Sequence, residues 1–430
     1  MSIFSSAFRL LVARLVGAAV GFVTQIVLAR LLPMEDLGLY FAATSFAALA
    51  AIVATQGYPG VMQRFITRYR ERQSRRLLVS FTRQIQIETV LITAVLSVAI
   101  AFIGFTWPKF IDDRMIVLLG LVLCLAAASS LTLYSGFAMV ERRFELAQLP
   151  ETLFRPILFL PIIIAMRDFA FPMTADTIVL AYALLTGALA LFQLLAILPG
   201  IDAADANQTR SIPQWRTEAR LYALAILFAT SFGDLVIVLA SPFLGAADLA
   251  PFGVAVKVSL LIGFAVQVAH QVSLPSLAET NERKDAGGLH RALLPAAVFP
   301  AIVTGGALVA VAVGGGHFLV LFGENYAAAK WPLFILVLGQ LLRAVAGPNQ
   351  SMLMLKGAQW ANAVICIAST ITLVILNVVL VPYLGPYGAS VAVLIAVAVW
   401  VGSSAIVLSR RYRERVDLPY LLLSLRRRVT

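Results

Sequence analysis

The chain has 430 residues, of which 60% are hydrophobic and 13% are charged, and its mean hydropathy is +0.91. This composition excludes an ordinary soluble domain and predicts a membrane protein. A net charge of +11 would suggest a nucleic-acid partner in a soluble chain. Here the basic residues lie between apolar segments, so we expect no nucleic-acid partner.

Apolar segments of about 20 residues recur along the whole chain. At a rise of about 1.5 Å per residue, such a segment crosses the ~30 Å hydrocarbon core of a bilayer. The predicted fold class is therefore an all-α polytopic membrane protein with twelve transmembrane helices. These are predicted at 10–32, 36–57, 84–106, 115–139, 151–166, 175–198, 220–242, 251–275, 292–315, 331–355, 358–381 and 386–408.

The basic residues predict the orientation of the chain. The two termini and alternate loops hold 25 of the 33 lysines and arginines, whereas the opposite loops hold four. Loops rich in Lys and Arg stay in the cytoplasm. Both termini are therefore predicted to be cytoplasmic. One of the loops assigned to this side is 140–156, which contains Arg155.

A polar segment at 199–220 divides the predicted helices into six and six. A short echo supports two related halves, because Asp-Leu-Gly-Leu-Tyr at 36–40 resembles Asp-Leu-Ala-Pro-Phe at 248–252. Duplicated bundles with a substrate site between the halves are a common transporter design. The predicted organisation is an N-terminal lobe at 1–200, a cytoplasmic linker at 201–219, a C-terminal lobe at 220–408 and a basic tail at 409–430.

Two amphipathic segments are predicted to lie on the cytoplasmic membrane surface. In 58–76, apolar residues recur at helical spacing opposite a row of arginines, and in the tail Leu418–Leu425 precedes Arg426–Arg428. Basic amphipathic helices bind anionic membrane lipids, which are the predicted partners here. Either segment could be a topology anchor or could collect an anionic lipid substrate.

Charged residues inside predicted spans are candidate site residues, because a charge at mid-bilayer costs about 3 kcal/mol. Arg343 is predicted near the middle of 331–355, facing an aqueous cavity, while Arg14 and Lys257 lie nearer the ends of their spans. Arg30 and Glu88 are weaker candidates. Arg30 is close enough to the outer surface to snorkel, and Glu88 is expected to be solvated at the start of its helix.

Asp234 and Lys257 lie at similar predicted depths on successive helices and could meet. The two readings are a structural ion pair and a group that couples ions to transport. The predicted spans hold more cations than carboxylates, and a positive interior favours an anionic group such as phosphate, which arginine binds through a planar fork. No catalytic residue, cofactor or metal site is predicted, since Cys124 and Cys366 both fall within spans.

Four short motifs resemble those of bacterial polysaccharide flippases (Wzx-like transporters), whose superfamily also holds lipid II flippases and multidrug and toxin extrusion exporters. Residues 28–40 (Leu-Ala-Arg-Leu-Leu-Pro-Met-Glu-Asp-Leu-Gly-Leu-Tyr) resemble the junction of the first two helices. Asp234 with Leu-Gly at 244–245 and Phe-Gly at 252–253 is similar to the helix 7–8 pattern. The stretches 321–329 (Leu-Phe-Gly-Glu-Asn-Tyr-Ala-Ala-Ala) and 381–389 (Val-Pro-Tyr-Leu-Gly-Pro-Tyr-Gly-Ala) are similar to later outer turns.

The resemblance implies two six-helix lobes around a central cavity in the bacterial inner membrane. It implies export of a lipid-linked oligosaccharide, carried on undecaprenyl pyrophosphate, by alternating access for O-antigen, capsule or exopolysaccharide synthesis. A cationic cavity would hold the pyrophosphate, and this role falls to Arg14, Lys257 and Arg343. A polysaccharide polymerase complex is a further candidate partner, and we expect a monomer. Ala-Pro at 250–251 departs from the pattern of the first half.

Two other functions stay open. A cation-coupled multidrug exporter of the same superfamily would need acidic residues inside the cavity. The first two predicted helices hold none, since Glu35 and Asp36 are assigned to the loop between them. A membrane-embedded glycosyltransferase or polymerase would be expected to carry carboxylates, Arg or His in a sizeable outer loop. The outer loops here are short, and His317 stands alone in the longest of them.

Overall fold

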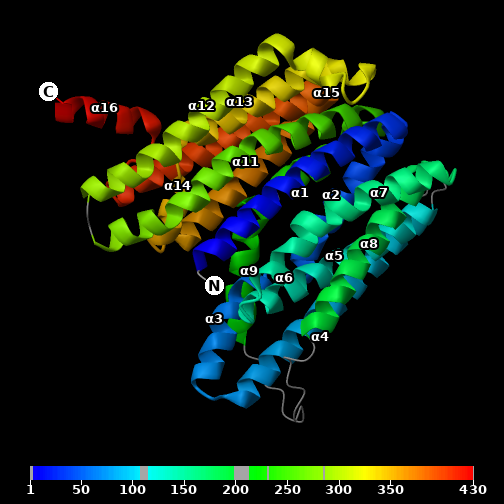
Figure 1. The fold of residues 1–430 in the computed structure, drawn as a ribbon, viewed down its shortest axis with the longest axis horizontal. Helices are drawn as coiled ribbons and strands as arrows, with labels where there is room; N and C mark the ends of the chain where they lie inside the picture. Colours follow the sequence, from blue (N-terminus) through cyan, green and yellow to red (C-terminus); the bar gives the residue numbers. More distant parts are fainter. Residues whose placement is uncertain (1–2, 107–114, 198–212, 230–231, 284–285, 430) are drawn as a thin grey trace. The chain divides into compact units, whose positions relative to one another are not determined.

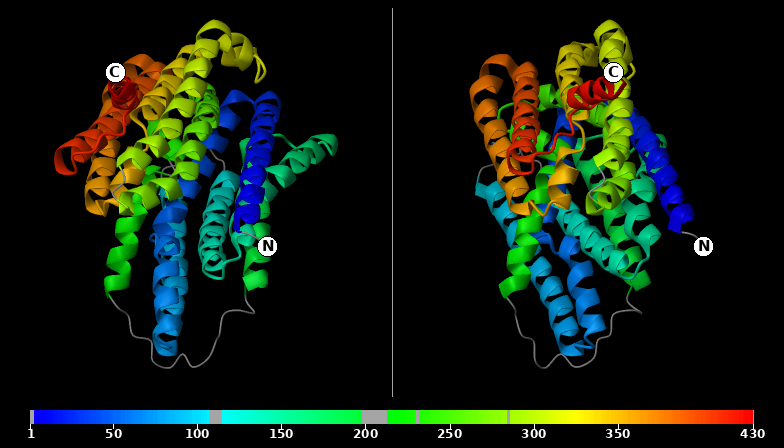
Figure 2. Two further views of the ribbon diagram at one scale, coloured as in Figure 1. Left: turned by 60° about the vertical axis from the view of Figure 1, so that its left-hand side comes forward. Right: turned by 90° about the vertical axis from the view of Figure 1, so that its left-hand side faces the viewer.

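The computed structural model describes residues 3–106, 115–197, 213–229, 232–283 and 286–429, and the described part of the chain is helical without strands. By its internal contacts the chain divides into two units, Met1–Leu235 and Val236–Thr430. Helices of these units are drawn in Figures 1 and 2. Most of the predicted linker lies outside the described residues, and its end, 213–219, already forms helix. The predicted domain boundaries therefore stay a prediction.

The first unit contains long helices separated by short turns, and α5 packs along α8. A sharp bend at Gln56 and Gly57, both with positive φ, separates α2 from α3. Their bounds are α1 Ile3–Leu31, α2 Met34–Ala54, α3 Tyr58–Glu71, α4 Arg75–Thr106, α5 Met115–Val140, α6 Phe144–Leu149, the π-helix η2 Pro150–Phe154, α7 Arg155–Asp168, α8 Ala175–Ile197 and α9 Pro213–Ala229. The short α10, Phe232–Ala240, crosses the division between the units.

The second unit is a bundle in which α12 packs against both α11 and α13, and α13 packs against α15 (Figure 1). Its elements are α11 Ala246–Glu282, α12 Ala286–Leu319, the 3-10 helix η4 Glu324–Ala329, α13 Lys330–Ala346, α14 Asn349–Leu355, α15 Gln359–Arg411 and α16 Leu418–Val429. The echo between the two halves is local: Asp36 and Asp248 each lie in the first turn of a helix, α2 and α11.

Ten stretches of the described residues are long and apolar enough to cross a membrane. One of them, α15, contains two of the predicted helices, because Gly385 between Pro382 and Pro386 has non-helical backbone angles. The predicted helix at 220–242 corresponds to α9 and α10. Each predicted span therefore has a helical counterpart, and the chain is a multi-pass membrane protein.

Two predicted helices differ from those observed. The helix predicted at 151–166 begins at Phe144 and runs through η2 into α7. The helix predicted at 331–355 ends at Ala346, because Gly347 adopts a positive φ of 74° and Pro348 follows it. A Cβ at Gly347 would lie 2.4 Å from the carbonyl oxygen of Val416, so only glycine fits this break.

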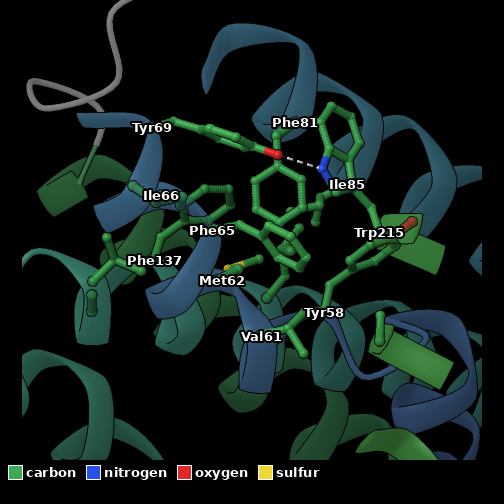
Figure 3. Packing of buried hydrophobic residues seen from close by; sticks show 14 of the residues in the cluster. Tyr58, Val61, Met62, Phe65, Ile66, Tyr69, Phe81, Ile85, Phe137 and Trp215 are labelled. Carbon is green, nitrogen blue, oxygen red and sulfur yellow. Dashed lines mark hydrogen bonds between the residues drawn. The ribbon is translucent and has the colours of Figure 1, made fainter. Parts of the chain in front are cut away.

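The prediction that 58–76 lies on the lipid surface is wrong for its apolar face. Tyr58, Met62 and Phe65 on α3 are at most 1% exposed, and they pack with Phe81 of α4 and Trp215 of α9 (Figure 3). The indole Nε1 of Trp215 donates a 2.7 Å hydrogen bond to the hydroxyl of Tyr69. The helix is amphipathic as predicted, but protein and not lipid covers its apolar face.

The structure also shows the positions of the tail helix α16 and of the two cysteines. Asp417 caps α16, since the backbone N–H of Tyr420 donates to its Oδ2 at 3.2 Å, and Leu421 is buried. The membrane-surface position of this helix stays a prediction. Cys124 and Cys366 are both free and buried within helices.

Candidate functional site

Arg343 lies in the last turn of α13, where the helix dipole favours a cation. Its Nη1 donates a 2.9 Å hydrogen bond to Oε1 of Gln340, and its Cζ lies 5.3 Å from the centre of the Trp400 ring. Trp400 is 11 residues before Arg411, the end of α15, or about 16 Å along the helix axis. Arg343 is therefore deep in the span, although it ends a broken helix and does not occupy the middle of a continuous one.

The partners of Arg343 are neutral. Among the residues that the structure describes, no carboxylate forms an ion pair with it. Gln340 is 4% exposed and is held against α11 at Gly263, where a Cβ would lie 2.4 Å from the Gln340 Oε1. The helix dipole and an amide thus compensate this charge only in part.

His270 lies two turns after Gly263 on α11 and is within electrostatic range of Arg343. Its Nε2 is buried without a hydrogen-bond partner in the described part of the chain. A buried polar atom of this kind is costly unless something pairs with it. Arg343, Gln340, Trp400 and His270 therefore form a polar group inside the second unit.

The first unit holds a second half-buried arginine within a helical stretch, Arg155, which is not among the residues predicted for the site. Arg155 was counted in the cytoplasmic loop 140–156, but it follows η2 within the 25-residue helical stretch Phe144–Asp168. This position is near the middle of the stretch. The loop assignment of Arg155 is therefore wrong, and it joins Arg343 as a cation deep in a span.

The surroundings of Arg155 are aromatic. Its Cζ lies 5.3 Å from the centre of the Tyr182 ring on α8, and Tyr182 packs edge-on against Phe159 and Tyr40 at 5.3 and 6.1 Å. Tyr40 and Phe159 are 4% and 3% exposed. The carboxylate of Glu151 is 3.5 Å away, one turn before Arg155. Cation–π contacts of this kind strengthen where water is scarce.

The π-helix beside Arg155 is locked by α1. Pro156 has no N–H to donate to the carbonyl of Thr152 four residues before it, which disrupts α-helical pairing at this point. A Cβ at Gly17 on α1 would lie 1.8 Å from that same carbonyl oxygen, whereas a Cβ at Gly21 would make an ordinary 3.7 Å contact with Pro156. Helix α1 therefore packs closely on η2 at Gly17.

The other three predicted cations do not lie at one place within a single unit. Arg14 lies half-buried on α1 and Arg30 is exposed in the last turn of that helix, while Lys257 lies half-buried on α11 of the second unit. Each of them makes further interactions. Their role in binding substrate stays a prediction.

Asp234 lies near the start of α10, where its Oδ1 accepts a 2.9 Å hydrogen bond from the Ser45 hydroxyl of α2. Both residues belong to the first unit. The predicted meeting of Asp234 with Lys257, and the choice between an ion pair and a coupling group, stay open.

Glu88 is not solvated, contrary to expectation. Its side chain is 11% exposed and accepts hydrogen bonds from Tyr58 Oη, Gln56 Nε2 and Gln84 Nε2 at 2.7, 2.9 and 2.9 Å. Arg216 of α9 donates from Nε at 2.8 Å and forms an ion pair with it. This pairing raises the pKa of Arg216. Glu88 thus joins α4 to the turn between α2 and α3, to α3 and to α9, and both oxygens of its carboxylate accept hydrogen bonds within the protein.

Comparison with known proteins shows the fold. No protein-family model and no curated protein matches the chain. The structure of lipid II flippase MurJ in an inward closed conformation is 13% identical, aligned over 94% of this chain and 87% of its own, with a TM-score of 0.71. An inward-facing multidrug resistance MATE family transporter of the MOP superfamily is 13% identical over 91% and 98%, with a TM-score of 0.63.

A MOP superfamily transporter from Pyrococcus furiosus is also similar, at 14% identity over 92% and 93% and a TM-score of 0.57. The chain has the fold of these membrane transporters. The all-α class with twelve helices in two lobes is confirmed. At such low identity the likeness extends to the fold and not to the substrate.

Proposed function

We propose that this protein flips a lipid-linked oligosaccharide from the cytoplasmic to the outer leaflet of the bacterial inner membrane, with both termini in the cytoplasm. Arg343 carries the proposal, because it is a cation inside a span and its partners among the described residues are an amide and an aromatic ring. A phosphate or pyrophosphate is the group that such a guanidinium binds best, through charge-assisted paired hydrogen bonds. The fold shared with lipid II flippase MurJ is compatible with this substrate class.

Several parts of the proposal rest on the sequence alone. The carrier is undecaprenyl pyrophosphate, the path is a central cavity opened by alternating access, and Arg14 and Lys257 add positive potential to it. Anionic lipids and a polysaccharide polymerase complex are the further partners, and the transporter is a monomer.

The test is glycan export in cells that depend on this protein. Arg343→Ala should lower export at least tenfold at normal protein levels, because charge-assisted hydrogen bonds contribute about 1.5–3 kcal/mol. Arg343→Lys should restore export only in part, because Lys lacks the planar fork. The matched control is Lys330→Ala on the same helix, since Lys330 also lies 5.3 Å from an aromatic ring, that of Trp331. Wild-type export by Arg343→Ala would refute the proposal.

Export of cationic drugs is the second candidate function. It is favoured by Asp234, a carboxylate that accepts a hydrogen bond from Ser45 inside the first unit, and by the fold shared with MATE transporters. Drug accumulation separates the two functions. If Asp234→Asn raises drug accumulation while Arg343→Ala leaves glycan export intact, the exporter reading replaces the flippase.

A further inference from the structure

Arg155 is held in a fixed position but is only weakly paired. Its side chain is 23% exposed, and its ion pair with Glu151 spans 3.5 Å between residues one turn apart, with the Glu151 side chain 54% exposed. A pair at this distance, with one partner largely in contact with solvent, contributes little. Arg155 can therefore exchange Glu151 for an anion that binds it more strongly.

The platform beneath Arg155 is rigid. Tyr182 is backed by the buried rings of Tyr40 and Phe159, which lie 6.4 Å apart and nearly parallel. A guanidinium over a ring keeps its N–H donors at its own edge, where they can form a fork with an oxyanion. The aromatic cluster thus orients the donors without consuming them.

The backbone that presents Arg155 is specialised. Single-turn π segments inside α-helices occur frequently at functional sites. Here η2 ends at Phe154, directly before Arg155, and the N–H of Arg155 bonds to the carbonyl of Pro150. Arg14 lies three residues before Gly17 and hence on the α1 face that packs on η2. A second cation on this face adds positive potential near the same segment.

We propose that Arg155, on the ring of Tyr182, is an oxyanion-binding site in the first unit, where a bound phosphate or carboxylate displaces Glu151. This site rests on the proposed function, because its ligand belongs to the transported molecule. The oxyanion is either the diphosphate of the lipid carrier or the carboxylate of an acidic sugar. In both cases a paired, charge-assisted contact replaces the 3.5 Å pair with Glu151.

The experiment measures binding to the full-length protein in nanodiscs with two probes, farnesyl diphosphate and an oligosaccharide of glucuronic acid. Arg155→Gln should raise the Kd for one probe at least tenfold, and the probe that responds identifies the source of the oxyanion. Glu151→Gln should lower the same Kd severalfold, because the competing carboxylate is gone. The matched control is Arg167→Gln, an exposed cation at the end of the same helix, which should change neither Kd.

The opposite signs at Glu151 and Arg155 separate binding from a structural role. Weaker binding by Arg155→Gln without a gain by Glu151→Gln overturns the proposal, and so do unchanged values for both variants. If Arg155→Gln does not fold, the Glu151 variant decides alone, since its side chain is largely exposed. If only Arg343→Ala weakens binding, the Arg155 site fails and the proposed function stands. If the wild type binds neither probe, both fail.

Discussion

Two half-buried charged groups within helices of this protein have opposite surroundings. Glu88 in the first unit accepts hydrogen bonds from four side chains, one of them an arginine, and joins helices that are far apart in the sequence. Arg343 in the second unit has an amide and an aromatic ring. The carboxylate of Glu88 is fully engaged within the fold, whereas the charge of Arg343 is only partly compensated. The number and charge of their partners distinguish the two groups.

The difference indicates how to find a ligand site among membrane charges. A carboxylate with its acceptor sites filled stabilises the fold, and removing it leaves several donors unpaired. An arginine on a ring with no close carboxylate keeps its donors for another molecule. Arg155 shares with Arg343 the 5.3 Å distance to a ring, and its carboxylate partner Glu151 lies at 3.5 Å with a largely exposed side chain.

The contrast between Glu88 and Arg343 is tested most directly by replacing Glu88. Glu88→Ala should lower the free energy of unfolding by about 3 kcal/mol, because it leaves Arg216 and three further donors without their acceptor. Thermal unfolding in detergent measures the loss. The control is Glu218→Ala, whose partner Arg64 is 60% exposed, and it should cost under about 1 kcal/mol. Equal effects of the two variants would show that Glu88 is not the structural centre of its group.

The packing that positions Arg155 can be tested with two glycines of one helix. Gly17→Ala should lower the free energy of unfolding by about 2 kcal/mol, since the new Cβ meets a backbone carbonyl at 1.8 Å. Gly21→Ala meets only an ordinary contact and should be neutral or slightly stabilising, because alanine favours helix. The same unfolding measurement compares them. A Gly17 variant as stable as wild type would contradict the close crossing of α1 and η2.

The smallest effect is expected at the start of α16. Asp417→Ala should cost about 1 kcal/mol of helix stability, because it removes the acceptor for the Tyr420 N–H. Asp417→Asn should be close to wild type, since asparagine caps equally well. Amide hydrogen exchange of α16 reports the change, which should leave Arg343-dependent export unaltered. Unchanged amide exchange in the Asp417→Ala variant would show that Asp417 does not stabilise the start of α16.

The sequence predicted the spans because apolar length is a direct requirement of the bilayer. It counted Arg155 in the loop 140–156, which overlaps the span predicted from 151, because the short helix 144–149 before the prolines was not recognised as part of that span. It expected Glu88 to be solvated, because the side chains that donate hydrogen bonds to it include Gln56 and Arg216, 32 and 128 residues away. It predicted that lipid covers the apolar face of α3, because periodicity reveals that a face is buried but not what covers it. Arg343 was predicted from its depth in the span, and its role in the site stays a prediction, whereas the break at Gly347 was not foreseen.

The placement of the two cysteines has a practical consequence. Cys124 and Cys366 are the only thiols in the sequence, and they are 1% and 2% exposed among helix side chains. A water-soluble maleimide therefore has no native target on the folded protein. Single cysteines at Gln73 or Asp248 can be introduced on the unaltered chain, so that labelling from either side of the membrane, or attachment of a spectroscopic reporter, reads one position without background.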